Sequence, residues 1–255
     1  MARNRIGIWF IGAKGGVAST AIVGLLALKK GLTQTTALVS ELPQFKHLEL
    51  VDWKDLVLGG HEIRDLSSYE EAMRLSTESR AIDGELIAKI KGELDKLDKV
   101  IRPGTAANSG ATIEGLAMPA VKSKTGESPR DTIDRLQADM KKFADENKLA
   151  HVIVINVAST EPPFDAAQFP AKWNELAKLF DKPKKCPLPA SSLYAIAALE
   201  LGYSHFNFTP LARFEFPGDR RAGRRAQARA TWATTARRAK RCSRACSRRC
   251  LLAAT

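Results

Sequence analysis

Three glycines near the beginning of the sequence have the spacing and the setting to hold a phosphate. Residues 5–20 read RIGIWFIGAKGGVAST, in which Gly12, Gly15 and Gly16 follow an apolar run typical of a buried parallel strand. The helix-like stretch 18–32 comes next. A strand, a glycine turn and a helix in this order place a phosphate against free backbone N–H groups at the helix N-terminus. Because the spacing is Gly-x-x-Gly-Gly rather than the common Gly-x-Gly-x-x-Gly, a dinucleotide-binding loop and a purely structural turn both remain open.

An acidic residue ends the next predicted strand. Residues 35–41 (TTALVSE) are predicted to form the second strand, which ends at Glu41. Dinucleotide-binding folds place at about this point a carboxylate that accepts hydrogen bonds from ribose hydroxyls. Glu41 is therefore a candidate for that role, and the alternative is a solvated loop glutamate.

A glycine pair and two polar side chains belong to a third apolar segment. Residues 55–63 (DLVLGGHEI) predict a strand that runs into a turn at Gly59 and Gly60. A glycine pair after a strand lets the backbone approach a ligand closely. His61 is more typical of a loop histidine than of a base, and Glu62 could reach a ribose or an adenine.

Small and polar residues follow the clearest interior strand. Residues 151–157 (HVIVINV) are β-branched and almost continuously apolar, which predicts a buried strand. Ala158, Ser159, Thr160 and Glu161 come directly after it. Open α/β sheets bind ligands at the carboxyl ends of their strands, so this segment is a second candidate for ligand contact.

The remaining segments supply the elements that must position these residues. Helices are predicted over 67–92, 129–147, 173–180 and 187–200, and a last strand over 203–209. This alternation of strands and helices predicts an α/β fold with a Rossmann-like, doubly wound parallel sheet.

The positive charge of the chain is concentrated in one segment. Residues 211–255 hold 13 of the 40 Lys and Arg residues but 2 of the 28 Asp and Glu residues, a net charge of +11 out of +12. Residues 1–210, the body of the chain, are therefore nearly neutral, with a net charge of +1. This charge argues against nucleic acid as their partner. We expect a dinucleotide-binding domain over 1–210 and a basic low-complexity tail over 211–255.

Composition also bears on membrane, compartment and cysteine chemistry. The sequence has no run of 18 apolar residues, so no segment is expected to span a membrane. The opening MARNRIGIWF leads straight into the first predicted strand, so we expect no signal peptide and a cytoplasmic protein. Cys186 is the single cysteine of the body, and we expect neither a disulfide framework nor a metal site there.

Four segments of the body carry a resemblance to a known family. They read, in order, GAKGGVAST, DLVLGGHEI, VINVASTE and SSLYAIAALELGYSHFNFTP. They resemble the glycine-rich NAD loop, the Gly-Gly-Trp-Asp-Ile segment, the strand ending in Asn-Thr-Glu, and the Ala-rich helix leading to an Asn-containing strand of bacterial-type myo-inositol-1-phosphate synthases (inositol-3-phosphate synthases). The resemblance covers nearly all of residues 5–210. His61 and Glu62 stand where the family often has Trp-Asp, and Ser159 where it often has Asn.

The resemblance implies a cofactor, a substrate and an assembly. The family converts glucose 6-phosphate to inositol phosphate: NAD oxidises C5, the C6 enolate attacks the C1 aldehyde, and the hydride is returned. Cations must lie near the phosphate and the enolate, because negative charge develops there. The family forms homotetramers, mostly through a second domain that also carries the catalytic lysines. The implied NAD contacts are Gly12, Ala13, Gly15, Gly16, Ser19, Thr20, Glu41, Gly60, Glu62, Ala158, Ser159 and Thr160.

The family's lysine-bearing segment, which contains Gly-x-Asp-Gly-Lys-Thr-Gly, is absent from residues 211–255 as they are written. Three interpretations of these residues compete. They could be a basic arm for nucleic acid or an anionic surface. Cys242, Cys246 and Cys250 could bind a metal, although their spacing is no standard zinc pattern. The residues could also be an out-of-frame translation.

The genetic code favours the out-of-frame interpretation. When the last base of each codon is joined to the first two bases of the next, synonymous codons for residues 232–249 can spell Gly-His-Asp-Gly-Lys-Thr-Gly-Glu-Thr-Leu-Leu-Lys-Ser-Val-Leu-Ala-Pro. This is the missing family segment in one run. Residues 213–224 match family sequence less well, and only in a different reading frame. This second match would require a second frameshift.

A frameshift has consequences for function. We expect the second domain to be largely missing from this chain, NAD binding to be weak or absent, and glucose 6-phosphate not to be turned over. Two other functions stay open at this point. One is a nucleotide-binding module whose basic arm holds an acidic partner, and the other is an ordinary NAD dehydrogenase.

Overall fold

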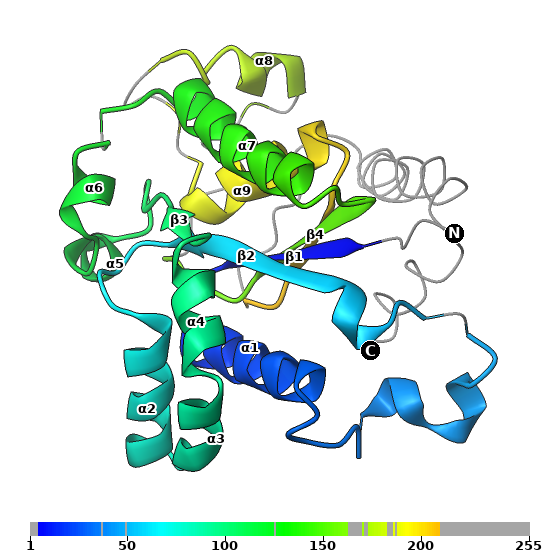
Figure 1. The fold of residues 1–255 in the computed structure, drawn as a ribbon. Coiled ribbons are helices and arrows are strands. Elements are labelled where there is room, and N and C mark those ends of the chain that lie inside the picture. Colours follow the sequence, from blue (N-terminus) through cyan, green and yellow to red (C-terminus); the bar gives the residue numbers. More distant parts are fainter. Residues whose placement is uncertain are drawn as a thin grey trace.

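A five-stranded parallel sheet forms the centre of the molecule in a computed structural model (Figure 1). The structure describes residues 5–36, 38–48, 50–124, 126–162, 170, 173–182, 186 and 188–209. The strands are β1 (Ile6–Ile11), β2 (Leu56–Glu62), β3 (Arg102–Pro103), β4 (His151–Asn156) and β5 (Ser204–Asn207). Their order is β3-β2-β1-β4-β5, and every neighbouring pair is parallel. The predicted α/β fold with a Rossmann-like, doubly wound sheet is therefore confirmed.

Helices cover both faces of the sheet, as Figure 1 shows. One face carries α1 (Gly16–Lys29), α2 (Ser68–Glu78), α3 (Gly84–Lys89) and α4 (Lys91–Asp98). The other carries α7 (Pro129–Glu146), α8 (Trp173–Ala177) and α9 (Ala190–Glu200). The short helices α5 (Ala111–Gly115) and α6 (Pro119–Lys122) lie beyond the carboxyl end of β2. No described helix has the length and apolar character that crossing a bilayer requires.

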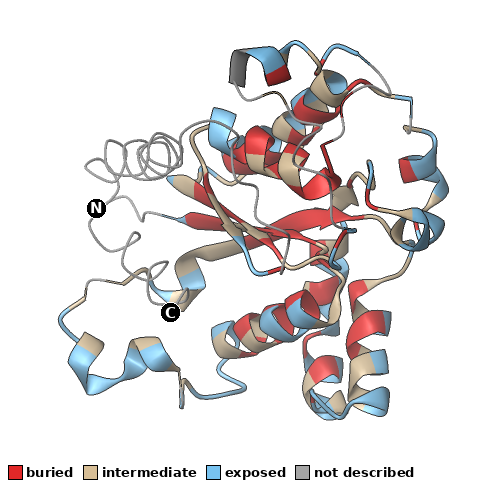
Figure 2. Cartoon of the chain, turned by 180° about the vertical axis from the view of Figure 1, so that it is seen from behind, coloured by how far each residue is buried: buried red, intermediate tan, exposed pale blue. Residues whose placement is uncertain are grey.

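The core consists of two apolar layers, one on each face of the sheet. Successive strand residues point to opposite faces. Trp9 therefore packs with Phe143 of α7, at 5.0 Å between ring centroids, while Phe10 packs with Ile22 of α1 in the opposite layer. Figure 2 shows the buried residues gathered in the strands and on the sheet-facing sides of the helices.

The register of the sheet brings several strand ends to one level. Ile11, the last residue of β1, is paired with His61 of β2 on one side and with Asn156 of β4 on the other. Asn156 is in turn paired with Asn207 of β5. Residues that follow these strands must consequently meet at one edge of the sheet.

The second strand is not where the sequence predicts it. The described residues among 35–41 form no strand: Val39–Glu41 form a 3-10 helix, and Val39 is 54% exposed. The strand that pairs with β1 here is β2, and its glycines leave room for large side chains on β1. A Cβ on Gly59 would lie 2.8 Å from the Trp9 ring. The predicted turn at Gly59 and Gly60 is wrong for the same reason, since both residues lie inside β2.

The predicted helix over 67–92 is divided in the structure. α2 ends at Glu78, Arg80 takes a positive φ of 53°, and the Asp83 side chain caps the N-terminus of α3. A positive φ cannot continue a right-handed helix, so the chain turns there. The other predicted helices and strands are present with shifted ends.

Candidate functional site

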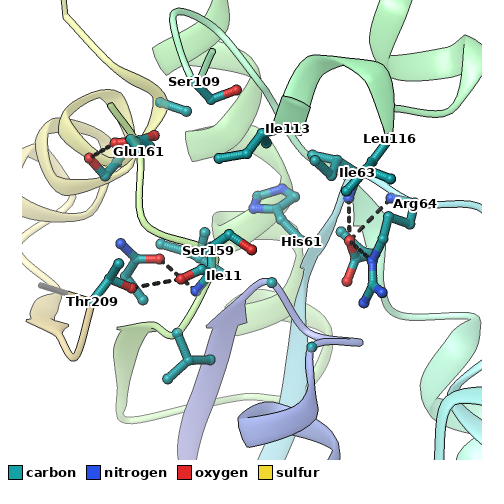
Figure 3. A pocket seen from close by; sticks show the side chains of 18 of the residues that line it. Ile11, His61, Ile63, Arg64, Ser109, Ile113, Leu116, Ser159, Glu161 and Thr209 are labelled. Carbon is teal, nitrogen blue, oxygen red and sulfur yellow. Dashed lines mark hydrogen bonds and ion pairs between the residues drawn. The ribbon is translucent and has the colours of Figure 1, made fainter. Parts of the chain in front are cut away.

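A cleft of about 380 Å³ opens at the carboxyl ends of β1, β2, β4 and β5 (Figure 3). It lies where the chain order of the strands reverses beside β1, the position at which open α/β sheets bind ligands. In Figure 3, His61 lies between Ile63 and Arg64 on one side and Ser159 and Thr209 on the other. The described residues that line the cleft come from the glycine loop, from the ends of the strands, and from α2, α5 and α9.

The glycine loop gives the cleft its backbone wall. Gly12 has a φ of +78°, and a Cβ there would lie 2.9 Å from the Cα of Ala158, so only glycine fits. Gly15 is the N-cap of α1, offers no side-chain cap, and is followed by a first turn without acidic residues. A Cβ on Gly16 would meet Leu75 at an ordinary 3.5 Å. The N-terminus of α1 thus presents backbone N–H groups to the cleft, where an anion is favoured.

Backbone hydrogen bonds tie this loop to the end of β2. The N–H groups of Gly12 and Ala13 both donate to the carbonyl of His61, at 3.0 and 3.1 Å. Gly60 makes the close approach possible, because a Cβ there would lie 2.5 Å from the carbonyl oxygen of Phe10. Gly60 therefore serves packing in this structure and does not line the cleft.

Glu62 fastens the same loop with its side chain. Its Oε2 accepts a 2.9 Å hydrogen bond from the N–H of Lys14. Its Oε1 accepts from the N–H groups of Ile63 and Arg64, at 2.8 and 3.1 Å. The Arg64 guanidinium donates back to the Lys14 carbonyl at 2.5 Å. A carboxylate at the end of β2 thus holds the glycine loop in place.

His61 is fully buried and bonded through both ring nitrogens. The Trp9 indole donates to Nδ1 at 2.9 Å, so Nδ1 is an acceptor, and Nε2 lies 3.2 Å from the Asp139 carboxylate. The neutral tautomer with a proton on Nε2 fits both contacts. Burial lowers the pKa of His61, and the hydrogen bond to Asp139 opposes this. His61 therefore lies in β2 as a neutral structural side chain rather than in a loop.

Amide side chains organise the β4–β5 side of the cleft. The Asn156 amide donates to the Asn207 side chain at 3.1 Å and accepts from the N–H of Ala158 at 3.2 Å. Thr209 closes the arrangement, because its hydroxyl donates to the Ala158 carbonyl at 2.8 Å. The backbone opposite Gly12 is thereby fixed by side chains of two strands.

A carboxylate also meets the N-terminus of α9. Glu161 accepts hydrogen bonds from the N–H and the hydroxyl of Ser191, at 2.9 and 2.5 Å. Burial raises the pKa of Glu161, and the two Ser191 bonds oppose this rise. Burial also raises the pKa of Tyr194, whose hydroxyl oxygen accepts from the Thr105 N–H. This side of the cleft accordingly offers polar groups that already have protein partners.

The structure brings half of the predicted cofactor contacts together. The predicted residues that line the cleft are Gly12, Gly15, Gly16, Glu62, Ala158 and Ser159. Those that do not line it are Ala13, Ser19, Thr20, Glu41, Gly60 and Thr160. Thr20, for example, donates to the Gly16 carbonyl within α1. Glu41 lies in a 3-10 helix, and Glu62 ends the strand beside β1 instead.

Several residues that line the cleft were not predicted from the sequence. Asn156 could have been found, since it is a polar residue near the end of a predicted interior strand. Arg64, Thr105 and Tyr194 carry no local signal, because distant contacts bring them to the cleft. No group of three or more His, Cys, Asp or Glu among the described residues is arranged to hold a metal ion. The three tail cysteines lie outside the described residues.

A parallel sheet in this order, with a glycine loop leading into a helix beside its switch point, defines a dinucleotide-binding domain. The model of an NAD-binding domain described as myo-inositol-1-phosphate synthase matches residues 37–235. The chain therefore belongs to the myo-inositol-1-phosphate synthase family, which binds NAD. This membership favours a cofactor-binding domain over a nucleotide-binding module with a basic arm.

Two relatives extend the comparison. The chain is 28% identical over 175 residues to inositol-3-phosphate synthase 1 of Bacteroides thetaiotaomicron, covering 63% of this chain and 38% of that protein. The crystal structure of inositol-3-phosphate synthase from Caenorhabditis elegans superimposes with a TM-score of 0.65 at 20% identity, over 82% of this chain and 45% of that one. The second comparison shows a shared fold. The chain spans less than half the length of either relative.

Proposed function

We propose that residues 5–209 form the NAD-binding part of an inositol-3-phosphate synthase, and that NAD binds in the cleft beside β1, although only weakly because the expected second domain is largely missing. The N-terminus of α1 carries this proposal: it opens into the cleft without a side-chain cap, and Gly16 leaves space beside it. Such a helix end favours a pyrophosphate through its N–H groups and its dipole. Family membership supports the choice of cofactor.

The residues of the cleft fit the chemistry of a dinucleotide. Gly12, Gly15 and Gly16 would face the pyrophosphate, and Glu62 stands where such folds place the ribose acceptor. Ala158 and Ser159 would bound the other side. NAD, when bound, supplies a hydride acceptor. The chain's own residues orient the cofactor and restrict water around it.

We further propose that this chain, with residues 211–255 as in the printed sequence, does not turn over glucose 6-phosphate. The described residues that line the cleft include no lysine. Of its two arginines, Arg74 pairs with Glu71 and Glu78, and Arg64 contacts Glu62. Among the described residues, a sugar phosphate and an enolate would meet there only cations that are already paired with carboxylates. Glucose 6-phosphate as substrate, a homotetramer and a cytoplasmic location stay predictions.

The division of the chain at residue 210 is part of the same proposal, and residues 211–255 lie outside the described residues. An out-of-frame origin for residues 232–249 stays a prediction that the coding DNA can decide. We expect its codons, read one base out, to encode the lysine-bearing segment. Codons that encode any other run would refute the frameshift. Turnover of glucose 6-phosphate with NAD by the purified full chain would refute the proposed inactivity.

Calorimetric titration of NAD into the full chain tests the cofactor proposal, with two glycine variants of α1 as a matched pair. Gly16→Ala adds a methyl group at the helix end and should lower NAD affinity by at least about tenfold. Gly24→Ala adds the same group where nothing lies within 4 Å, and should leave the affinity unchanged. Equal affinities in both variants would remove α1 from the proposed site.

A further inference from the structure

Lys14 belongs to the glycine loop, but it does not line the cleft. Its side chain is 11% exposed, and its ammonium group donates to the Leu66 carbonyl at 2.5 Å. The Asp98 carboxylate lies 3.0 Å from the same ammonium group. The charge of Lys14 is thus directed to the segment between β2 and α2 and to the last residue of α4 rather than into the cleft.

Asp98 is itself bonded to the N-terminus of α2. Both of its carboxylate oxygens lie 3.1 Å from the Ser68 backbone nitrogen, and Oδ1 also accepts from the Ser68 hydroxyl at 2.7 Å. A carboxylate at this end of a helix is favoured by the helix dipole. Ser68 is buried, so these bonds give Asp98 a defined position beside Lys14.

The main chain of Lys14 is bonded as well. Its N–H donates to the Glu62 carboxylate, and its carbonyl accepts from the Arg64 guanidinium. The next residue, Gly15, is the N-cap of α1. Because the N–H, the carbonyl and the ammonium group of Lys14 all have partners, this residue fixes the direction in which the chain enters α1.

We infer that Lys14 and Asp98 are positioning residues for the cofactor: their ion pair holds the glycine loop so that the first turn of α1 presents its N–H groups to the pyrophosphate. The inference rests on the proposed function above, since it concerns the same loop and the same ligand. A loop that is already ordered costs less free energy to fix on binding. Neither residue lines the cleft, so their effect on NAD must pass through the loop.

A lysine in a glycine loop could instead be a phosphate ligand, and the two roles predict opposite effects of Asp98→Asn. This substitution removes the charge and keeps the shape of the side chain. If Asp98 positions the loop through Lys14, the affinity for NAD should fall by at least about fivefold. If Asp98 restrains a phosphate ligand, the released ammonium group should raise the affinity. A rise in affinity would therefore overturn the inference.

Lys14→Met tests the other half of the ion pair. NAD is titrated calorimetrically into the full chain, well below the melting temperature of each variant. The loss of affinity should be similar to that of Asp98→Asn. The double variant should lose little more than either single variant, because both substitutions remove one and the same interaction. Losses that add fully would show that the two residues do not act together.

Lys91→Met and Asp95→Asn are the matched controls. These two residues pair at 2.7 Å on α4, the helix that ends at Asp98, and both side chains are about half exposed. The substitutions remove the same charges and should leave the NAD affinity unchanged within about twofold. If they weaken NAD binding as much as Lys14→Met and Asp98→Asn do, the effect is a general one of charge and the assignment is wrong.

A measurement on the unmodified chain covers the case in which the variants do not fold. The nitrogen NMR signal of the Lys14 ammonium group should keep its chemical shift in saturating NAD, whereas the Gly16 amide signal should move. An ammonium signal that moves as far as this amide would place Lys14 against the cofactor. That result would overturn the inference and leave the proposed function intact. Absence of NAD binding by the unmodified chain would overturn both.

Discussion

The two sides of the cleft are built from different materials. On the β1–β2 side the glycine loop forms a backbone wall, which consists of glycines, the open end of α1, and main-chain bonds from Gly12 and Ala13 to the His61 carbonyl. The Glu62 carboxylate fastens this loop. On the β4–β5 side the wall is held by side chains, led by Asn156 and Thr209. The first side suits a charged phosphate, since helix N–H groups and their dipole favour anions. The second suits neutral polar groups.

The difference also determines which substitutions each side tolerates. The backbone wall should be destabilised when a substitution adds a side chain, because the new atoms would clash with neighbouring main chain that cannot move aside. A side-chain wall fails when a hydrogen-bonding group is removed, because its buried partners lose their bonds. The next two predictions test each side by the damage that should be specific to it, and a third concerns a buried histidine of β5.

Gly12→Ala should have the largest effect. The new Cβ would lie 2.9 Å from the Cα of Ala158, and the φ of +78° is unfavourable for any L side chain. We expect the free energy of unfolding to fall by about 3 kcal/mol, measured by urea denaturation. Gly24→Ala is the control and should not destabilise the chain. Equal stability of the two variants would show that the contact between Gly12 and Ala158 is not rigid.

Asn156→Leu should have the next largest effect, on the opposite side. The substitution leaves the Ala158 N–H and the Asn207 side chain without this partner. We expect a loss of about 2 kcal/mol in the free energy of unfolding. The double variant with Asn207→Leu should lose less than the sum of the single variants, because the two amides are coupled. Strict additivity would contradict a side-chain wall.

His205 should produce a smaller, pH-dependent effect on β5. Its Nε2 is buried without a hydrogen-bond partner among the described residues, and burial lowers the pKa of His205 to about 4. The unfolded chain binds a proton near pH 6.5, and the folded chain binds it only near pH 4, so stability falls as the pH drops through this window.

The His205→Phe variant isolates this contribution. We expect it to flatten the pH dependence of the unfolding free energy, a difference of about 1–2 kcal/mol at pH 5 relative to pH 7. Urea denaturation at both pH values measures it. His61 has its pKa lowered by burial as well and should keep part of the slope in the variant. Identical slopes with and without His205 would show that its ring is accessible to protons.

What the sequence could predict follows the same division. The glycine loop and the strand ending at Asn156 are local patterns, and the structure contains both. The wrong second strand at residues 35–41 arose because local pattern cannot tell which segment takes the place beside β1. That choice depends on Gly59 of β2, because the absence of a side chain there leaves room for the Trp9 ring of the neighbouring strand β1. The contacts of Tyr194 and Arg64 likewise depend on distant partners.

The central claim is that a pyrophosphate binds at the backbone wall. Amide NMR of the full chain during an NAD titration tests it most directly, because it observes each backbone N–H group separately. The largest chemical-shift changes should fall on Gly12, Gly15 and Gly16, with smaller changes at Ala158 and Ser159. Saturating NAD that leaves the three glycine amides unshifted, or shifts only amides far from the cleft, would contradict the claim.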